Sequence, residues 1–245
     1  MPPSKVRLSE MSQPGSMVLC VIPARGGSKG LPGKNLMLLE GESLVARAVR
    51  HARESGVCDR IVVTTDSPEI AAEARRAGAE TPFVRDAAIS GDLATTEETL
   101  RDALMRSEAA FACRFDVCVF VSPTDIFREP RWIAACVEAL RADANLESAF
   151  VGLSTHKNFW EQSDDGTWHR LRDWMKVYSS RQVRRRVVRE DTGLACASRA
   201  ELWRAGRRIG DRVHIIVNDD DFSSIDIHKR EDLLLAQAAL GIRGT

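Results

Sequence analysis

Residues 17–35 of the chain read MVLCVIPARGGSKGLPGKN, an apolar run that passes directly into a loop rich in glycine and proline. The apolar part, residues 17–22, ends at Pro23 and predicts a short buried strand. The part that follows, residues 23–34, holds four glycines and two prolines and predicts a tight loop. The segment therefore predicts an α/β fold whose first loop leaves the sheet at the end of a strand.

This loop brings backbone amides and positive charge together. Glycines let amide N–H groups approach a ligand closely, and Arg25, Lys29 and Lys34 place three cations within ten residues. Clustered amides and cations favour a bound polyphosphate, and the alternative is an exposed basic turn without a ligand. Two common phosphate-loop patterns do not match. Ser28 and Asn35 stand where a Walker A loop has glycine and Ser/Thr, and the pattern G-x-G-x-x-G is absent.

Outside this segment the sequence alternates between strand-like and helix-like patterns. Strands are predicted at residues 60–64, 81–84, 117–121, 193–198 and 213–217, and helices at 43–54, 68–77, 97–107, 132–141 and 233–240. Such repeated βα units predict an α/β fold with a mostly parallel sheet and helices on both faces. Ligands bind beyond the carboxyl ends of the strands in such sheets, so the loops 23–34, 85–95 and 122–130 are expected to form the site.

The composition narrows the functional class. Lys+Arg and Asp+Glu are both 35, so the formal net charge is zero and the basic excess of a typical nucleic-acid binder is missing. No apolar run approaches the length of a bilayer span, and residues 1–16 lack the apolar core of a signal peptide. The six cysteines show no C-x-x-C spacing, which favours free thiols over a zinc site or disulfides. We therefore expect a cytoplasmic protein with no nucleic-acid or membrane partner, made of a disordered tail at 1–16 and one domain at 17–245.

One segment, residues 154–189, interrupts the alternation and is called the arm below. It holds Trp160, Trp168 and Trp174, followed by a basic run over residues 181–189. Aromatic residues are enriched at subunit interfaces, so we expect the arm to form a homodimer. A site for an anionic ligand is the alternative use of the basic run.

The glycine-rich loop and several later segments together resemble one family. The stretch from Ile22 to Leu36 resembles the signature of the acylneuraminate cytidylyltransferases, the CMP-sialic acid synthetase family. Weaker similarities follow in the same order along the chain, at residues 60–66, 84–85, 92–96, 224–227 and 231–233. Together these segments extend over residues 17–240.

The resemblance implies a Rossmann-like nucleotidyltransferase fold, a dimer built by the arm, and a reaction that uses CTP with Mg²⁺. Because His228 stands in the expected metal segment, a softer metal such as Mn²⁺ is the alternative. It implies that Arg25 and Lys34 hold the triphosphate as catalytic cations, and that Asp226 binds the metal. The nucleotide-binding residues that it implies are Gly26, Gly27, Ser28, Lys29, Gly30, Asn35, Arg85, Ala94, Thr95 and Thr96.

The sequence departs from the family pattern on the acceptor side of the expected site. Ser122-Pro-Thr-Asp-Ile126 replaces the family's Gln-Pro-Thr-Ser-Pro, Thr192-Gly193 replaces Asn-Gly, and Asp226-Ile-His228 replaces Asp-x-Asp. Three changes around one half of the site indicate an unusual acceptor. The expected acceptor-binding residues are Ser122, Thr124 and Arg181, and the expected metal ligands are Asp226, Asp125 and His228.

The expected reaction transfers CMP from CTP to the anomeric hydroxyl of a 2-keto-3-deoxy sugar acid that resembles sialic acid, a nonulosonate, and releases pyrophosphate. The departures leave open an eight-carbon sugar acid or a phosphonate as acceptor, and a non-catalytic nucleotide-binding relative. Two other classes fit less well. One is a nucleotidyltransferase that uses UTP or GTP on a sugar phosphate, and the other is an NAD-dependent oxidoreductase, whose dinucleotide pattern is missing.

Overall fold

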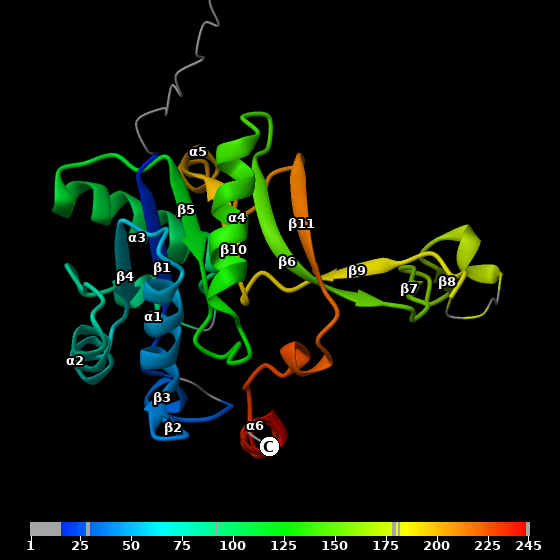
Figure 1. Ribbon diagram of the computed structural model, residues 1–245, viewed down its shortest axis with the longest axis horizontal. Helices are drawn as coiled ribbons and strands as arrows, with labels where there is room; N and C mark the ends of the chain where they lie inside the picture. The colour runs from blue at the N-terminus through cyan, green and yellow to red at the C-terminus, as the bar shows by residue number, and fades with distance from the viewer. Residues whose placement is uncertain (1–15, 28–29, 92, 178–179, 181, 244–245) are drawn as a thin grey trace, which may run out of the picture.

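The computed structural model describes residues 16–27, 30–91, 93–177, 180 and 182–243, and a seven-stranded sheet runs through it (Figure 1). The strands of this sheet are β1 (Val18–Pro23), β4 (Arg60–Thr64), β5 (Val117–Phe120), β6 (Ser148–Thr155), β9 (Val187–Glu190), β10 (Cys196–Arg199) and β11 (Val213–Asn218). The helices are α1 (Leu44–Glu54), α2 (Pro68–Ala77), α3 (Thr96–Phe111), α4 (Pro130–Ala142), α5 (Ala200–Arg204) and α6 (Arg230–Arg243). Nearly all of the expected tail lies outside the described residues.

The strand order is β11-β6-β10-β5-β1-β4, and β9 pairs with β6. β1 is parallel to both β4 and β5, and β11 is parallel to β6. β10 is antiparallel to β5 and β6, and β9 is antiparallel to β6, so these two strands run against the other five. The predicted α/β fold with a mostly parallel sheet is confirmed.

Both faces of the central strand β1 are buried, which explains its unbroken apolar run. Val18 and Ile22 belong to a core shared with α1 and α4 on one face. Leu19 and Val21 belong to a second core, on the face covered by α3 and α5. All four side chains are inaccessible to solvent. The first expected strand therefore stands at the centre of the molecule, and its loop leaves from there.

The helix boundaries follow from local capping. The Ser67 side chain accepts a hydrogen bond from the Ile70 amide, and Pro68 is the first residue of α2. Gly78 ends that helix with a φ of 97°, a left-handed conformation that glycine adopts without strain. α3 begins with a capping box between Thr95 and Glu98. Both expected ends of α2 are confirmed. α3 begins at Thr96, one residue before the predicted start, and continues to Phe111 where the sequence predicted an end at residue 107.

One strand prediction was wrong, and another placed the start of its strand too early. Residues 81–84 form no strand, and only Glu80 makes a bridge, to Val62. Pro82 follows at once and has no amide hydrogen to donate to a neighbouring strand. The strand predicted at 193–198 begins only at Cys196, because residues 192–194 form a turn.

β6 and its partner β9 were not predicted at all. β6 continues from the sheet into the arm, and Gly152 interrupts its apolar pattern. A Cβ at residue 152 would lie 2.3 Å from Val188 Cγ1, so this glycine allows the two strands to pair closely.

The arm projects from the sheet beyond β6 and β9 (Figure 1). Its tip carries a small hairpin of β7 (Trp160–Gln162) and β8 (Trp168–Arg170). The Arg170 guanidinium covers the Trp160 ring at 4.3 Å from its centre, while Trp168 is 58% exposed. The arm therefore presents aromatic surface away from the core.

A third apolar cluster attaches the carboxyl-terminal part of the chain to the first loop. It joins Leu31 in that loop to Phe127 and to Ile225 and Ile227 before α6. Within the described residues no helix is both long and apolar enough to cross a membrane. All six cysteines are free thiols.

Candidate active site

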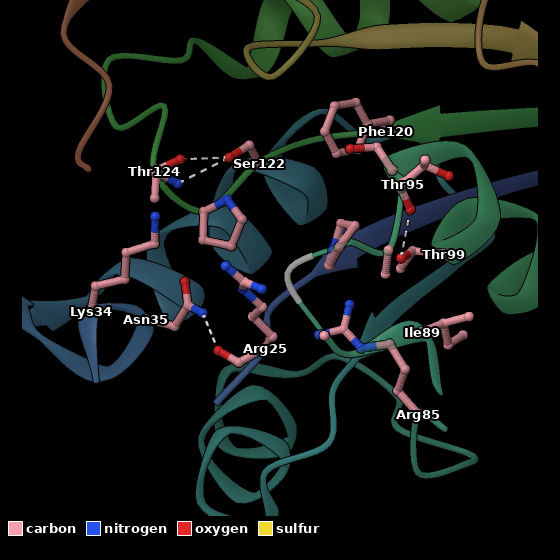
Figure 2. A pocket seen from close by; sticks show the side chains of 15 residues that line it. Arg25, Lys34, Asn35, Arg85, Ile89, Thr95, Thr99, Phe120, Ser122 and Thr124 are labelled. Carbon is pink, nitrogen blue, oxygen red and sulfur yellow. Dashed lines mark hydrogen bonds between the residues drawn. The ribbon is translucent and has the colours of Figure 1, made fainter. Parts of the chain in front are cut away.

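A cavity of about 270 Å³ lies beyond the carboxyl ends of β1, β4 and β5 (Figure 2). All three loops that the sequence singled out contribute to its wall. The lining residues are Pro23, Arg25, Lys34, Asn35, Arg85, Ile89, Gly91, Ala94, Thr95, Thr96, Thr99, Phe120, Ser122, Pro123 and Thr124. The structure therefore brings nine of the eighteen expected site residues together in the wall of this cavity.

Asn35 holds the two ends of the glycine-rich loop together. It is only 4% exposed, and its Nδ2 donates a hydrogen bond of 2.9 Å to the backbone carbonyl of Arg25. Gly33, just before, has a φ of 68°, which favours glycine. The closed loop directs the Arg25 and Lys34 side chains toward the same space (Figure 2). Asn35 thus acts on the position of Arg25, which the sequence alone did not indicate.

The loop glycines have other contacts and do not line the cavity. The Gly26 amide donates a 2.8 Å hydrogen bond to Asp66 Oδ1 at the end of β4. A Cβ on Gly30 would lie 2.5 Å from the His228 carbonyl oxygen, so Gly30 allows the carboxyl-terminal segment to pack on the loop. Gly27 also lies outside the cavity wall, and Ser28 and Lys29 fall outside the described residues.

Arg85 presents an almost unpaired guanidinium to the cavity (Figure 2). The residue is 5% exposed, and among the described residues its Nε and Nη2 have no hydrogen-bond acceptor. Its nearest carboxylate oxygen is Asp66 Oδ1, 3.9 Å away. Burial lowers the pKa of Arg85, and Asp66 partly opposes that shift. Buried N–H groups without acceptors are costly in a folded protein, so the Nε and Nη2 of Arg85 are suited to acceptor atoms of a ligand.

The opposite wall carries Ser122 and Thr124, whose hydroxyl oxygens are 2.7 Å apart (Figure 2). Behind them, the fully buried Arg128 fixes the loop. Its Nη2 donates to the Gly193 carbonyl at 2.6 Å and also to the Ser122 carbonyl, and its Nε donates to that of Leu194. Sequence reasoning missed Arg128, because nothing in the local pattern separates it from a surface arginine.

Two carboxylates lie next to the cationic loop. Burial, and then repulsion from Asp226, raise the pKa of Asp125 to about 7. The Ile227 amide donates a 3.2 Å hydrogen bond to the Thr124 carbonyl, which brings the segments that carry Asp226 and Asp125 together. Lys34 lies beside both: its Nζ donates a 3.2 Å hydrogen bond to the Ile227 carbonyl. Burial lowers the pKa of Lys34, while Asp226 and Asp125 partly offset that shift. The structure thus gathers Lys34, Asp125 and Asp226 in one place.

This arrangement fits a hard divalent cation. Asp226 Oδ1 is buried and has no hydrogen-bond partner among the described residues. Mg²⁺ prefers oxygen ligands and is usually held by one or two carboxylates together with substrate phosphates. His228 Nε2 lies 2.7 Å from Asp226 Oδ2, so the imidazole contacts this carboxylate and orients it. No group of three or more His, Cys, Asp or Glu in the described part of the chain could hold a metal alone.

A second cavity, of about 650 Å³, lies at the base of the arm, where β6 ends. Lys157, Arg184 and Arg189 supply positive charge to its wall, and Asp221 supplies one carboxylate. Arg181, the arginine expected to meet the acceptor, falls outside the described residues. The basic run of the arm is therefore partly turned toward a cavity.

A family model for cytidylyltransferases matches residues 19–183 of the chain. A CMP-N,N'-diacetyllegionaminic acid synthase from Legionella pneumophila is 40% identical over 121 residues, which cover 49% of this chain and 52% of that protein. A pseudaminic acid cytidylyltransferase from Campylobacter jejuni is 43% identical over 86 residues, which cover 35% of this chain and 37% of that protein. The chain thus spans about half the length, or less, of these curated relatives.

The fold is also similar to that of a solved CMP:2-keto-3-deoxy-manno-octonic acid synthetase in complex with CTP. The TM-score is 0.67 at 16% identity, and the match covers 93% of this chain and all of the other. At this identity the likeness concerns the fold, and it confirms the expected Rossmann-like nucleotidyltransferase architecture.

Proposed function

The chain belongs to the cytidylyltransferase family, and we propose that it transfers CMP from CTP to the anomeric hydroxyl of a nonulosonic acid, with release of pyrophosphate. The observation that carries this proposal is the cavity at the ends of β1, β4 and β5. There Arg25, Lys34 and Arg85 converge next to two carboxylates. Curated relatives at about 40% identity are named for CMP-legionaminic and pseudaminic acid chemistry.

In the proposed reaction the acceptor's anomeric oxygen forms a bond to the α-phosphorus of CTP. The bond from that phosphorus to the bridging oxygen breaks, and pyrophosphate leaves in line. The hydroxyl proton passes to a neighbouring carboxylate. Such transfers require alignment and charge neutralisation more than covalent participation by the protein. Arg25 and Lys34 supply the fixed positive charge, and Asn35 keeps Arg25 in place.

Asp226 would hold Mg²⁺, with Asp125 as the second carboxylate and His228 orienting Asp226. When bound, the metal would neutralise phosphate charge and align the leaving group. Mn²⁺ is the alternative metal, because it also accepts carboxylate and phosphate oxygens.

The acceptor acid would approach from the side of the arm. Lys157, Arg184 and Arg189 line the cavity at the base of the arm and could pair with a carboxylate. Ser122 and Thr124 would contact the acceptor from the wall that carries the departures from the family pattern. Because this wall departs from the family pattern, an eight-carbon sugar acid or a phosphonate is the alternative acceptor. The free thiols suit a reducing compartment, and we place the reaction in the cytoplasm.

Pyrophosphate release should require CTP, Mg²⁺ and one acceptor from a panel of 2-keto-3-deoxy sugar acids. The panel holds legionaminic, pseudaminic and N-acetylneuraminic acids, an eight-carbon acid and a phosphonate analogue. We expect a nonulosonic acid to give the highest kcat/KM, and UTP, GTP and ATP to support little turnover. Faster turnover with UTP or GTP would refute the assignment of the base. CTP binding without turnover on any acceptor would favour a non-catalytic relative.

We further propose that the protein is a homodimer built through the arm. Trp168 at the tip of the arm is 58% exposed, and Val177 and Val183 are 68% and 73% exposed. Light scattering at working concentration should give twice the monomer mass, and Trp168→Ser should weaken the dimer. Ala142→Ser, at the end of α4 and outside the arm, serves as the control. A monomeric mass in an active wild-type sample would contradict the proposal.

A further inference from the structure

Arg208 lies between α5 and β11, and its side chain contacts three elements that meet behind the nucleotide cavity. Its guanidinium carbon is 5.7 Å from the centre of the Phe120 ring. Its Nε lies 3.6 Å from Glu97 Oε1, and its Nη2 lies 3.3 Å from Glu190 Oε1. One side chain therefore joins an aromatic ring and two carboxylates from distant parts of the chain.

Each of these partners lies in the cavity wall, next to a residue of that wall, or on the strand that returns from the arm. Phe120, at the end of β5, is 7% exposed and forms part of the cavity wall. Glu97 lies in the first turn of α3, directly after Thr96, which also lines the cavity. Glu190 is the last residue of β9, the strand that returns from the arm to the sheet. Arg208 thus stands one layer behind the cavity and connects its wall to the base of the arm.

The backbone that carries Arg208 is fixed to the middle of the sheet. Ser198 Oγ donates a 2.6 Å hydrogen bond to the Arg208 carbonyl, and the Gly210 amide donates a 3.0 Å hydrogen bond to Ser148 Oγ. The two serine hydroxyls are 2.8 Å apart, in the buried sheet. The side chain is therefore directed from a rigid position, and only 24% of it is exposed.

We propose that Arg208 is a positioning residue for nucleotide binding. Its guanidinium fixes the position of the Phe120 ring relative to the start of α3, and it connects both to β9 through Glu190. The inference rests on the proposed CTP site. A planar guanidinium can meet two carboxylates and an aromatic ring at once, whereas a lysine ammonium acts as a single point of charge. The proposal therefore predicts that charge alone does not replace Arg208.

The test measures CTP affinity by calorimetry with Mg²⁺, and KM for CTP against kcat. Arg208→Gln should raise both the Kd and the KM for CTP by about fivefold, the effect of losing two partly exposed ion pairs and a ring contact, and leave kcat within about twofold. Arg208→Lys should restore only part of the affinity. Arg207→Gln is the matched control, because the neighbouring Arg207 is half-exposed and pairs with Asp211 at 3.0 Å on the same loop.

Glu97→Gln provides a second test if Arg208→Gln is unstable, because the Glu97 side chain is 37% exposed and the change keeps its shape. It should weaken CTP binding in the same direction, and the double variant should be no weaker than Arg208→Gln. Wild-type CTP affinity in either folded single variant, or an equal loss in Arg207→Gln, would overturn the inference and leave the proposed function intact. A wild-type protein that fails to bind CTP would overturn both, so the two failures are distinguishable.

Discussion

Arg25→Ala and Lys34→Ala should each lower kcat by about 10²–10³-fold while the protein remains folded. Both side chains enter the cavity from a loop that Asn35 closes, so their charge is already in place before negative charge develops on the phosphates. Removing one preorganised group that stabilises such charge typically has an effect of this size. The measurement is single-turnover pyrophosphate release at saturating CTP, with circular dichroism as the check on folding.

Two further variants test whether the loss of rate comes from the charge inside the cavity. Arg25→Lys keeps the charge and should recover part of the rate, whereas Arg76→Ala removes a 72% exposed arginine outside the cavity and should have no effect. Near-normal kcat in folded Arg25→Ala and Lys34→Ala would show that the loop takes no part in the chemistry. A rise in the KM for CTP with unchanged kcat would reassign both residues to ground-state binding.

Asp226→Asn should lower turnover by about 10²-fold and raise the Mg²⁺ concentration needed for half-maximal activity by at least about tenfold. The reason is the free Oδ1 of Asp226, a buried carboxylate oxygen without a hydrogen-bond partner among the described residues. The amide removes the charge and keeps the shape. Mn²⁺ binding in the presence of CTP, followed by electron paramagnetic resonance, reports on the metal site independently of activity.

Two neighbouring variants separate the roles around Asp226. Asp125→Asn should raise the metal requirement by a smaller factor, because Asp125 is the proposed second ligand. His228→Ala should alter kcat more than metal affinity, because the imidazole contacts Asp226 Oδ2 and orients the carboxylate. An unchanged metal requirement in Asp226→Asn would refute the central assignment. An unchanged requirement in Asp125→Asn would leave Asp226 to act with phosphates and water.

The sequence predicted those features that depend on local chemistry. The buried run before Pro23, the cap at Ser67 and the glycine end of α2 follow from neighbouring residues, and the structure confirms them. The convergence of three loops could also be predicted, because parallel strands place their carboxyl ends at one edge of the sheet.

The features that were missed depend on contacts between distant residues. Arg128 binds carbonyls 65 and 66 residues away in the chain, and no local pattern distinguishes it. The contacts of Arg208 exist only in the folded protein, because its partners lie on α3, β5 and β9. β6 was overlooked because Gly152 breaks the apolar pattern that identifies a strand, and the reason for that glycine is the approach of Val188 on β9.

The contact between Gly30 and the His228 carbonyl joins two segments that the ribosome synthesises at different times. The Lys34 ammonium group binds the Ile227 carbonyl across 193 residues of sequence. At a translation rate of roughly 5–20 residues per second, the ribosome needs on the order of 10–40 s to complete that interval. The loop and its partner segment are therefore made at different times. The contact between them forms only after the strands that lie between them in the sequence have been synthesised.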